Sequence, residues 1–332
     1  MLFVPWYDAA GVRILRDYRP ALRERTGVGQ YVHELASALG RQLTSTDSLT
    51  LFSSSWKDRL PSGVVRGATT VDLRLPVTAL NAAWHRLGWP PIERLAGPVD
   101  IAHSSHPLLM PARAAAQVVS IYDLDFLDHP ERTRAEIRRD YPTLAGDHAR
   151  RAALVLVIST HTAQQVEARL GVARERIVMC RPGAPDWVPR EAPPADGPIL
   201  FVGTIEPRKN LPALFAAYDR LVAGRPDTPP LLLAGRMVEH SPAILEMVRR
   251  YPRIEGRVKH LGYVADEERQ RLYREASLLV LPSLEEGFGM TAVEAMRIGV
   301  PVVASTRGAL PEVVGDAGTL VDPADEAGLA AA

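Results

Sequence analysis

Two cations and a glycine turn are the residues of this chain best suited to bind phosphate. Arg208 and Lys209 lie a few residues after the apolar segment 199–202. Glu286-Gly-Phe-Gly289 runs directly into a predicted helix that starts near Met290. Glycines let the backbone approach a ligand closely, and the first N–H groups of a helix face it with the positive end of the helix dipole. With the two cations, this turn could neutralise a diphosphate, although a solvated basic dipeptide and an ordinary loop would have the same residues.

Two carboxylates near this turn point to hydroxyl groups on the ligand. Glu286 and Glu294 are eight positions apart, which places Glu286 in the loop and Glu294 about one turn into the helix. A carboxylate beside a phosphate is electrostatically unfavourable unless it accepts hydrogen bonds from nearby donors. Sugar and ribose hydroxyls are such donors, so the pair favours a nucleotide sugar. The alternative for Glu294 is a solvent-facing residue that suits a helix.

Short apolar segments alternate with helical ones throughout the C-terminal half. The predicted strands are 199–202, 231–234, 258–261, 278–281 and 300–304, and the predicted helices are 211–222, 242–251, 266–276 and 290–298. This alternation is typical of a parallel sheet covered on both faces, as in a Rossmann-like domain. Ligands of such sheets bind outside the carboxyl ends of the strands. We therefore expect the Arg208-Lys209 loop and the Glu286 loop to lie on one edge.

The N-terminal half mixes strands and helices with weaker signals. Thr26-Gly-Val-Gly29 opens a predicted helix that Gly40 is expected to end. Residues 128–151 predict a solvated helix interrupted by Pro142. The predicted strands are 49–52, 118–122 and 154–158, and 75–110 is expected to be rich in loops that include His103 and His106.

A proline-rich stretch divides the chain. Residues 181–198, called here the linker segment, hold six prolines and two glycines, a composition that a core element does not tolerate. A length of 332 residues fits two domains of about 150 residues each. We expect an N-terminal domain over residues 1–185 and a C-terminal domain over residues 186–332.

Charge and cysteine content argue against several classes of protein. Lys+Arg and Asp+Glu are both 39, so the formal net charge is zero, which disfavours nucleic-acid binding through bulk charge. No apolar run approaches the roughly 18–20 residues of a membrane span, and residues 1–11 lack a signal-peptide pattern. The single Cys180 excludes an intramolecular disulfide framework and a multi-cysteine metal site. We expect a cytoplasmic protein.

Familiar nucleotide and catalytic motifs are missing. The sequence has no G-x-G-x-x-G after a strand, no P-loop and no G-x-S-x-G elbow. One string, Asp123-Leu-Asp125, could bring two carboxylates to a divalent metal. A single match in a chain of this length is a weak signal for a metal.

Taken together, these segments resemble glycosyltransferase family 4. Residues 286–296 resemble the E-x7-E signature of its retaining enzymes, and residues 201–210 look like the loop that binds the donor phosphates. The N-terminal landmarks of the family are matched, in order, by Thr26–Tyr31, Tyr122–Leu124, Ile158-Ser159 and Arg181–Gly183. The resemblance implies an α/β fold of the GT-B class, two Rossmann-like doubly wound parallel-sheet domains facing across a cleft.

The resemblance also implies a reaction. A hexose, with mannose among the candidates, would pass with retention from a GDP- or UDP-sugar to a glycan or lipid-linked acceptor, without a metal or a resident cofactor. Arg208 and Lys209 would stabilise the diphosphate. Glu286 would accept a hydrogen bond from the transferred sugar, and Glu294 would accept one from the ribose. The donor-binding residues would be Gly27, Gly29, Gly203, Val264, Gly287, Phe288, Gly289, Met290, Thr291 and Glu294.

Two departures from the family pattern bear on this activity. Tyr122-Asp123 stands where many relatives have His-Asp, so Tyr122, Asp123 and His103 are the candidates for contact with the sugar or acceptor. The sequence stops at Ala332, and we expect the helix that crosses back to the first domain in relatives to be missing. Both departures favour, as an alternative, a catalytically silent nucleotide-sugar-binding module. Peripheral contact with the inner membrane surface is implied by analogy, with residues 132–151 as its arginine-rich patch.

Overall fold

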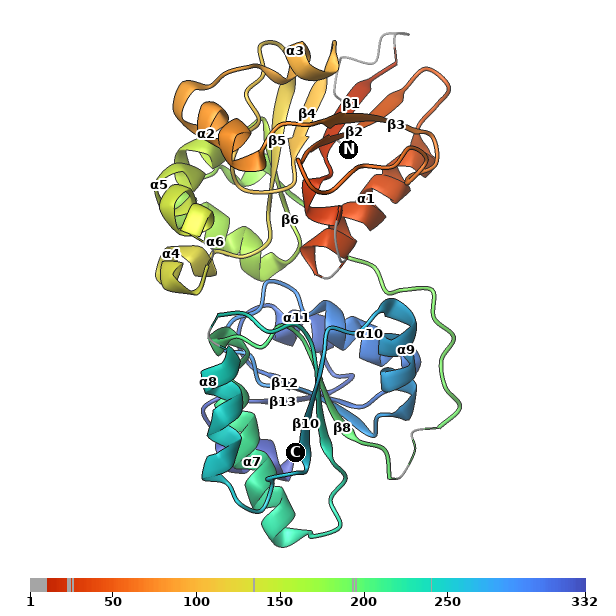
Figure 1. Cartoon of the computed structure of the whole chain (residues 1–332), viewed down its shortest axis with the longest axis vertical. Coiled ribbons are helices and arrows are strands. Elements are labelled where there is room, and N and C mark those ends of the chain that lie inside the picture. The colour runs from red at the N-terminus through yellow and green to blue at the C-terminus, as the bar shows by residue number, and fades with distance from the viewer. Residues whose placement is uncertain are drawn as a thin grey trace. The chain divides into compact units, whose positions relative to one another are not determined.

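The contacts within the chain divide it into two units. The structure, a computed structural model, describes residues 11–22, 25, 27–133, 135–192, 194, 196–239 and 241–332. The first unit runs up to residue 158 and includes 162–180, and the second holds 159–161 and 181–332. Each is built around its own parallel sheet (Figure 1). The predictions made for residues 1–10 and for Thr26 fall outside the described residues.

In the first unit, seven parallel strands are described, in the order β3-β2-β1-β4-β5-β6-β7. From β1 the next strands of the chain are added on one side of the sheet, and from β4 onward they are added on the other side. Strands β1 and β4 therefore flank the switch point where ligands of such sheets bind. The elements are β1 (Arg13–Asp17), α1 (Val28–Gln42), β2 (Ser48–Ser54), β3 (Ala68–Leu73), α2 (Val77–Leu87), α3 (Ile92–Ala96), β4 (Ile101–Ser104), β5 (Ala116–Ile121), α4 (Asp125–Asp128), α5 (Ala135–Arg151), β6 (Leu154–Val157), α6 (Thr160–Leu170) and β7 (Ile177–Met179).

Two helix predictions for this unit are wrong, an end at Gly40 and an interruption at Pro142. Helix α1 continues past Gly40 to Gln42, because this glycine serves packing rather than termination: a Cβ there would lie 2.7 Å from the Arg66 carbonyl oxygen. Helix α5 continues through Pro142. Tyr141 on one side of the proline and Ala145 on the other pack against the same apolar core, so tertiary contacts hold both halves in one helix.

The segment 75–110 is far more regular than predicted. It forms α2, α3 and β4, and the prolines that suggested loops mark where helices begin, since Pro76 and Pro91 are the N-cap residues of α2 and α3. Trp84 of α2 packs against Phe52 of β2, with ring centroids 5.7 Å apart. His103, expected in a loop, therefore lies in strand β4.

The second unit follows its predicted pattern closely. Its six described strands have the order β10-β9-β8-β11-β12-β13 and pair in parallel. The predicted helix 242–251 is a shorter helix followed by a 3₁₀ turn over 247–250. The elements are β8 (Ile199–Val202), α7 (Leu211–Gly224), β9 (Leu231–Ala234), α8 (Ser241–Glu246), β10 (Val258–Gly262), α9 (Asp266–Glu275), β11 (Leu278–Leu281), α10 (Met290–Ile298), β12 (Val302–Ser305), α11 (Leu310–Val314), β13 (Thr319–Val321) and α12 (Glu326–Ala331).

Both faces of the second sheet are covered. Leu200 of β8 belongs to the core that α9 and α10 cover, whereas Phe201, the next residue, belongs to the core under α7. Alternate residues of a strand point to opposite faces, so continuous apolar strands supply both cores. Leu329 of α12 packs against the core under α7. Among the described residues, no helix combines the length and apolarity needed to cross a bilayer.

The carboxyl ends of β8 and β9 approach each other more closely than side chains allow. Gly203 follows β8 and donates its N–H to the Ala234 carbonyl oxygen at 2.9 Å. Gly235 follows β9, and a Cβ on it would lie 1.8 Å from the Gly203 carbonyl oxygen. A glycine at position 235 is therefore required for the loop after β8 to start where it does.

We predict that Gly235→Ala destabilises the protein by about 1–3 kcal/mol, the usual cost of inserting an atom into a packed site. Urea unfolding followed by circular dichroism measures the change. Gly224→Ala is the matched control, because nothing lies within 4 Å of the added carbon in α7. Equal stability of the two variants would contradict the assigned role of Gly235.

Candidate active site

Two loops meet at the switch point of the second sheet. Strands β8 and β11 are neighbours there, although β9 and β10 separate them in the chain. The 3₁₀ turn Pro207–Lys209 follows β8, and the Glu286 loop follows β11. The Leu284 N–H donates to the Arg208 carbonyl oxygen at 2.8 Å and ties the loops together. The loops expected on one edge of the sheet are thus in direct contact.

The two predicted cations contact the predicted carboxylate. Lys209 Nζ donates to Glu286 Oε2 at 2.5 Å, and Arg208 Nη1 lies 3.7 Å from the same oxygen. Arg208 also donates to Glu206 Oε1 at 2.8 Å and to the Glu285 carbonyl oxygen at 3.1 Å. Lys209 is 9% exposed as a whole residue, so its charge is held by partners rather than by bulk water.

The ionisation of Glu286 follows from this contact. Burial acts to raise the pKa of its carboxyl, but the Lys209 and Arg208 cations outweigh burial and leave that pKa below its ordinary value. Glu286 is therefore ionised at neutral pH. A diphosphate entering this loop would compete with a carboxylate for the same two cations.

The glycine turn after Glu286 is shaped by close packing. Gly289 is the N-cap residue of α10 with φ +102°, and a Cβ there would lie 2.7 Å from Leu310 Cδ2. Phe288 is buried, as are Gly287 and Gly289. Met290 and Thr291 are the first two residues of helix α10. Among the described residues, no side chain caps its amino end. The positive end of this nine-residue helix therefore adjoins the Lys209–Glu286 pair.

Glu294 is buried, so the solvent-facing alternative is wrong. The residue is 7% exposed. Tyr273 Oη donates to Glu294 Oε2 at 2.9 Å, and Arg269 Nη2 lies 3.3 Å from Glu294 Oε1. Burial raises the pKa of the Glu294 carboxyl, and the Arg269 cation opposes that rise. Sequence reasoning did not single out Arg269 or Tyr273, although their spacing of four on α9 places them on one helix face.

The remaining predicted residues of the second unit lie at the same edge. A Cβ on Gly203 would lie 3.3 Å from Phe201 Cζ and 3.7 Å from Lys209 Cε, so this glycine lies beside the lysine stem. Val264, after β10, is half-buried against the core under α9 and α10. Nearby, the Arg236 guanidinium lies 5.9 Å from the Tyr263 ring centroid.

The glycines predicted for the first unit lie at the start of α1, and the predicted tyrosine follows β5. Gly27 is the N-cap residue of α1 with φ +50°, and Gly29 is buried inside that helix. Tyr122 follows β5, and its hydroxyl donates to the Ser105 carbonyl oxygen at 3.3 Å. Burial raises the pKa of Tyr122 to about 12, so the hydroxyl stays protonated at neutral pH. Asp123 Oδ1 accepts from the Asp125 N–H at 3.2 Å.

His103 is engaged inside the first sheet. Arg16 Nη1 contacts His103 Nδ1 at 2.7 Å, and Ser120 Oγ contacts Nε2 at 2.9 Å. Because an arginine can only donate, Nδ1 accepts and the Nε2 proton goes to Ser120. Burial lowers the pKa of His103 well below its ordinary value, which keeps the ring neutral. Both ring nitrogens are thus used within the unit.

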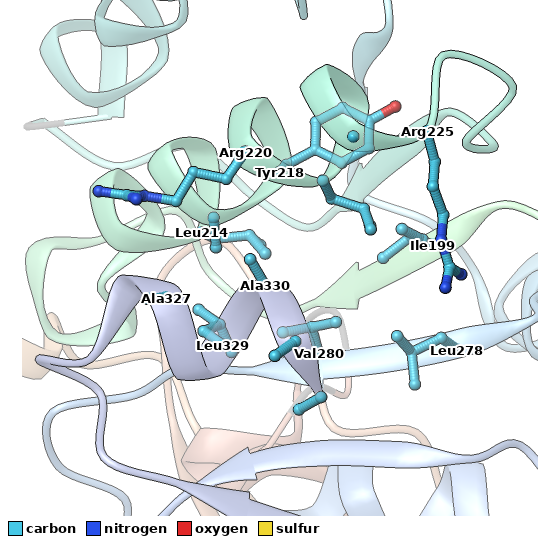
Figure 2. A pocket seen from close by; sticks show the side chains of 15 residues that line it. Ile199, Leu214, Tyr218, Arg220, Arg225, Leu278, Val280, Ala327, Leu329 and Ala330 are labelled. Atoms are coloured by element: carbon cyan, nitrogen blue, oxygen red, sulfur yellow. The ribbon is translucent and has the colours of Figure 1, made fainter.

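An apolar cavity of about 630 Å³ lies elsewhere in the second unit. Figure 2 shows Leu214 and Tyr218 of α7, Val280 of β11 and Leu329 of α12 along its walls. Ile199 and Leu278 also line it, and they are the first residues of β8 and β11. The cavity therefore extends to the amino ends of these strands, away from the loops that hold the cations.

Comparison with known proteins identifies the family. A model described as glycosyl transferases group 1 matches residues 197–332, and one described as a glycosyl transferase 4-like domain matches residues 26–183. The chain is 30% identical, over 341 aligned residues, to O-antigen chain mannosyltransferase B of Escherichia coli, covering 95% of this chain and 87% of that protein. The chain belongs to the group 1 glycosyltransferases. It is thus an enzyme of the hexosyltransferase class.

Solved structures confirm the fold predicted for this glycosyltransferase, two Rossmann-like domains of the GT-B class. Sucrose-phosphate synthase from Thermosynechococcus elongatus superposes with a TM-score of 0.76 at 20% identity, covering 97% of this chain and 88% of that one. HepE of Anabaena, in complex with UDP-glucose, gives 0.69 at 18% identity over 96% and 88% of the two chains. Among the described residues of the glycosyltransferase, no group of three His, Cys, Asp or Glu side chains could hold a metal ion.

Replacing Glu286 by glutamine should strengthen the binding of a free nucleoside diphosphate. The change removes the charge that competes with phosphate for Lys209 and Arg208, which we expect to raise affinity about 5–30-fold. Isothermal titration calorimetry with GDP and UDP measures it. Glu275→Gln, which neutralises an exposed carboxylate paired to Arg271 on α9, is the control. Weaker binding by the Glu286 variant would show that the carboxylate does not compete with phosphate.

Proposed function

We propose that this glycosyltransferase moves a hexose from a nucleoside-diphosphate sugar to a glycan or lipid-linked acceptor, with retention and without a metal. The observation that carries the proposal is the Arg208–Lys209–Glu286 cluster beside the amino end of α10. Two cations and a helix terminus suit a diphosphate, and an ionised carboxylate suits the hydroxyls of a sugar attached to it.

In the proposed reaction, negative charge grows on the diphosphate as its bond to the anomeric carbon breaks. Arg208 and Lys209 stabilise that charge, and the backbone N–H groups from Gly287 to Met290 hold phosphate and sugar oxygens. The acceptor hydroxyl attacks the face that the diphosphate leaves, and its proton passes to the departing phosphate oxygen. Glu286, displaced from Lys209 by the phosphate, accepts from a hydroxyl of the transferred sugar.

The relatives of the chain indicate which donors and acceptors to test. Mannose is the first sugar to test, because the relative matched over nearly the whole chain is a mannosyltransferase of O-antigen chains. That relative also favours a glycan or lipid-linked acceptor. HepE is solved with UDP-glucose, so both GDP- and UDP-sugars remain in the proposal. In the first unit, Gly27, Gly29, Tyr122 and Asp123 are the proposed contacts for donor phosphate, sugar or acceptor.

Incubation with a panel of GDP- and UDP-sugars should release nucleoside diphosphate from one donor class. Lys209→Met should lower kcat/KM about 10²–10³-fold, the usual effect of removing one group that stabilises transition-state charge. Lys259→Met, at an exposed lysine of β10 in the same unit, should turn over like the parent. Parent-like turnover by the Lys209 variant would contradict the assigned role of this lysine.

Turnover should be unchanged by EDTA, because the proposed diphosphate site uses Arg208, Lys209 and helix N–H groups in place of a metal. The product should keep the anomeric configuration of the donor, as read from the anomeric proton coupling by NMR. Loss of turnover that Mg²⁺ or Mn²⁺ restores would contradict the metal-free mechanism. An inverted product would contradict the retaining one.

A further inference from the structure

Glu294 is held by an organised set of neighbours that the proposed chemistry does not use. Tyr273 and Arg269 each contact one of its two carboxylate oxygens, at 2.9 and 3.3 Å. A carboxylate offers about four acceptor positions, so both oxygens keep capacity for a further donor. Tyr273 is fully buried, which fixes the direction from which its hydroxyl approaches.

The linker segment supplies the next layer of contacts. The Trp187 ring lies 5.9 Å from the Tyr273 ring, measured between centroids, and the Arg269 guanidinium lies 5.7 Å from the Trp187 centroid. Trp187 thus contacts both residues that hold Glu294. Arg269 Nη1 is also bound by Asp266 Oδ1 at 3.1 Å, so its fork is oriented from two sides.

The same part of the linker joins the carboxyl ends of α9 and α10. Arg190 donates from Nη1 to the carbonyl oxygens of Tyr273 and Arg274, and from Nη2 to that of Gly299. Its backbone N–H donates to the Ile298 carbonyl oxygen at 2.9 Å. A cation is favourable at both helix ends. Arg190 therefore holds the carboxyl ends of α9 and α10 together, and with them the distance between Tyr273 of α9 and Glu294 of α10.

We infer that Tyr273, Arg269 and Trp187 are positioning residues that hold the Glu294 carboxylate for the ribose hydroxyls of the donor nucleotide. The inference rests on the proposed function, and it assigns part of the linker segment to the donor site. Removing the Tyr273 hydroxyl would let the carboxylate turn away from the ribose while the diphosphate cations stay in place. The effect should therefore depend on the ribose hydroxyls and not on the phosphates.

The test compares each nucleotide with an analogue that lacks the ribose hydroxyls. Isothermal titration calorimetry gives the dissociation constants of GDP and UDP and of their 2′,3′-dideoxy forms for the parent chain. The parent should prefer the ribonucleotide at least about tenfold, the worth of a hydrogen bond to a charged group. In Tyr273→Phe this preference should fall to about twofold or less, with the affinity for the dideoxy form unchanged.

Tyr218→Phe is the matched control, because it removes a buried tyrosine hydroxyl that donates to the Pro229 carbonyl oxygen at 2.7 Å. It should keep the parent's preference. Arg269→Gln should lose the preference for the ribonucleotide, as Tyr273→Phe does. It provides an independent test if the tyrosine variant does not fold. Trp187→Leu should change the preference in the same direction by a smaller factor.

The outcomes separate this inference from the function on which it rests. A parent-like preference in Tyr273→Phe and Arg269→Gln would overturn the positioning role. If the parent shows no preference for the ribonucleotide, Glu294 does not bind the ribose and the inference is overturned. Binding of the nucleotide itself would still support the donor site. A parent chain that binds neither GDP nor UDP would overturn the proposed function and the inference together.

Discussion

The pairing of β8 with β11 is the constraint on which the rest of the candidate site depends. These strands are far apart in the chain but adjacent in the sheet, so the loop carrying Lys209 lies against the loop carrying Glu286. The ion pair between them has one partner from each loop. Neither loop alone can form this ion pair, because Lys209 belongs to one loop and Glu286 to the other.

The surrounding backbone keeps these loops where the strands leave them. Gly308 lies so close to the Glu286 loop that a Cβ would come 2.6 Å from its backbone, and the Ala309 N–H donates to the Glu286 carbonyl oxygen at 2.8 Å. Asn210, the other neighbour of the turn, adopts φ +54° and donates from its side chain to the Pro323 carbonyl oxygen. Contacts from the segments that follow β12 and β13 thus extend the support across the edge of the sheet.

Much of the second unit could be predicted because its signals are local. Strands β8, β9 and β11 and helix α10 match their predicted bounds, since short apolar runs and glycine caps mark both ends. The first unit was harder, because Gly40 and Pro142 have roles set by tertiary packing that a single sequence does not show. The same reason hid Tyr273: spacing places it beside Arg269 on one helix but cannot say which carboxylate of another helix they face. The alignment of chemical groups along one edge was predictable, whereas their individual partners were not.

The contacts of Arg190 and Trp187 also bear on where the donor unit can be separated from the rest of the chain. The family match begins at residue 197, and a fragment cut there would lose the guanidinium that binds the carbonyl oxygens of both helix ends. It would also expose the faces of Tyr273 and Arg269 that Trp187 covers. A donor unit that keeps these contacts therefore begins before Trp187, and Trp187 and Arg190 attach the proline-rich stretch to α9 and α10.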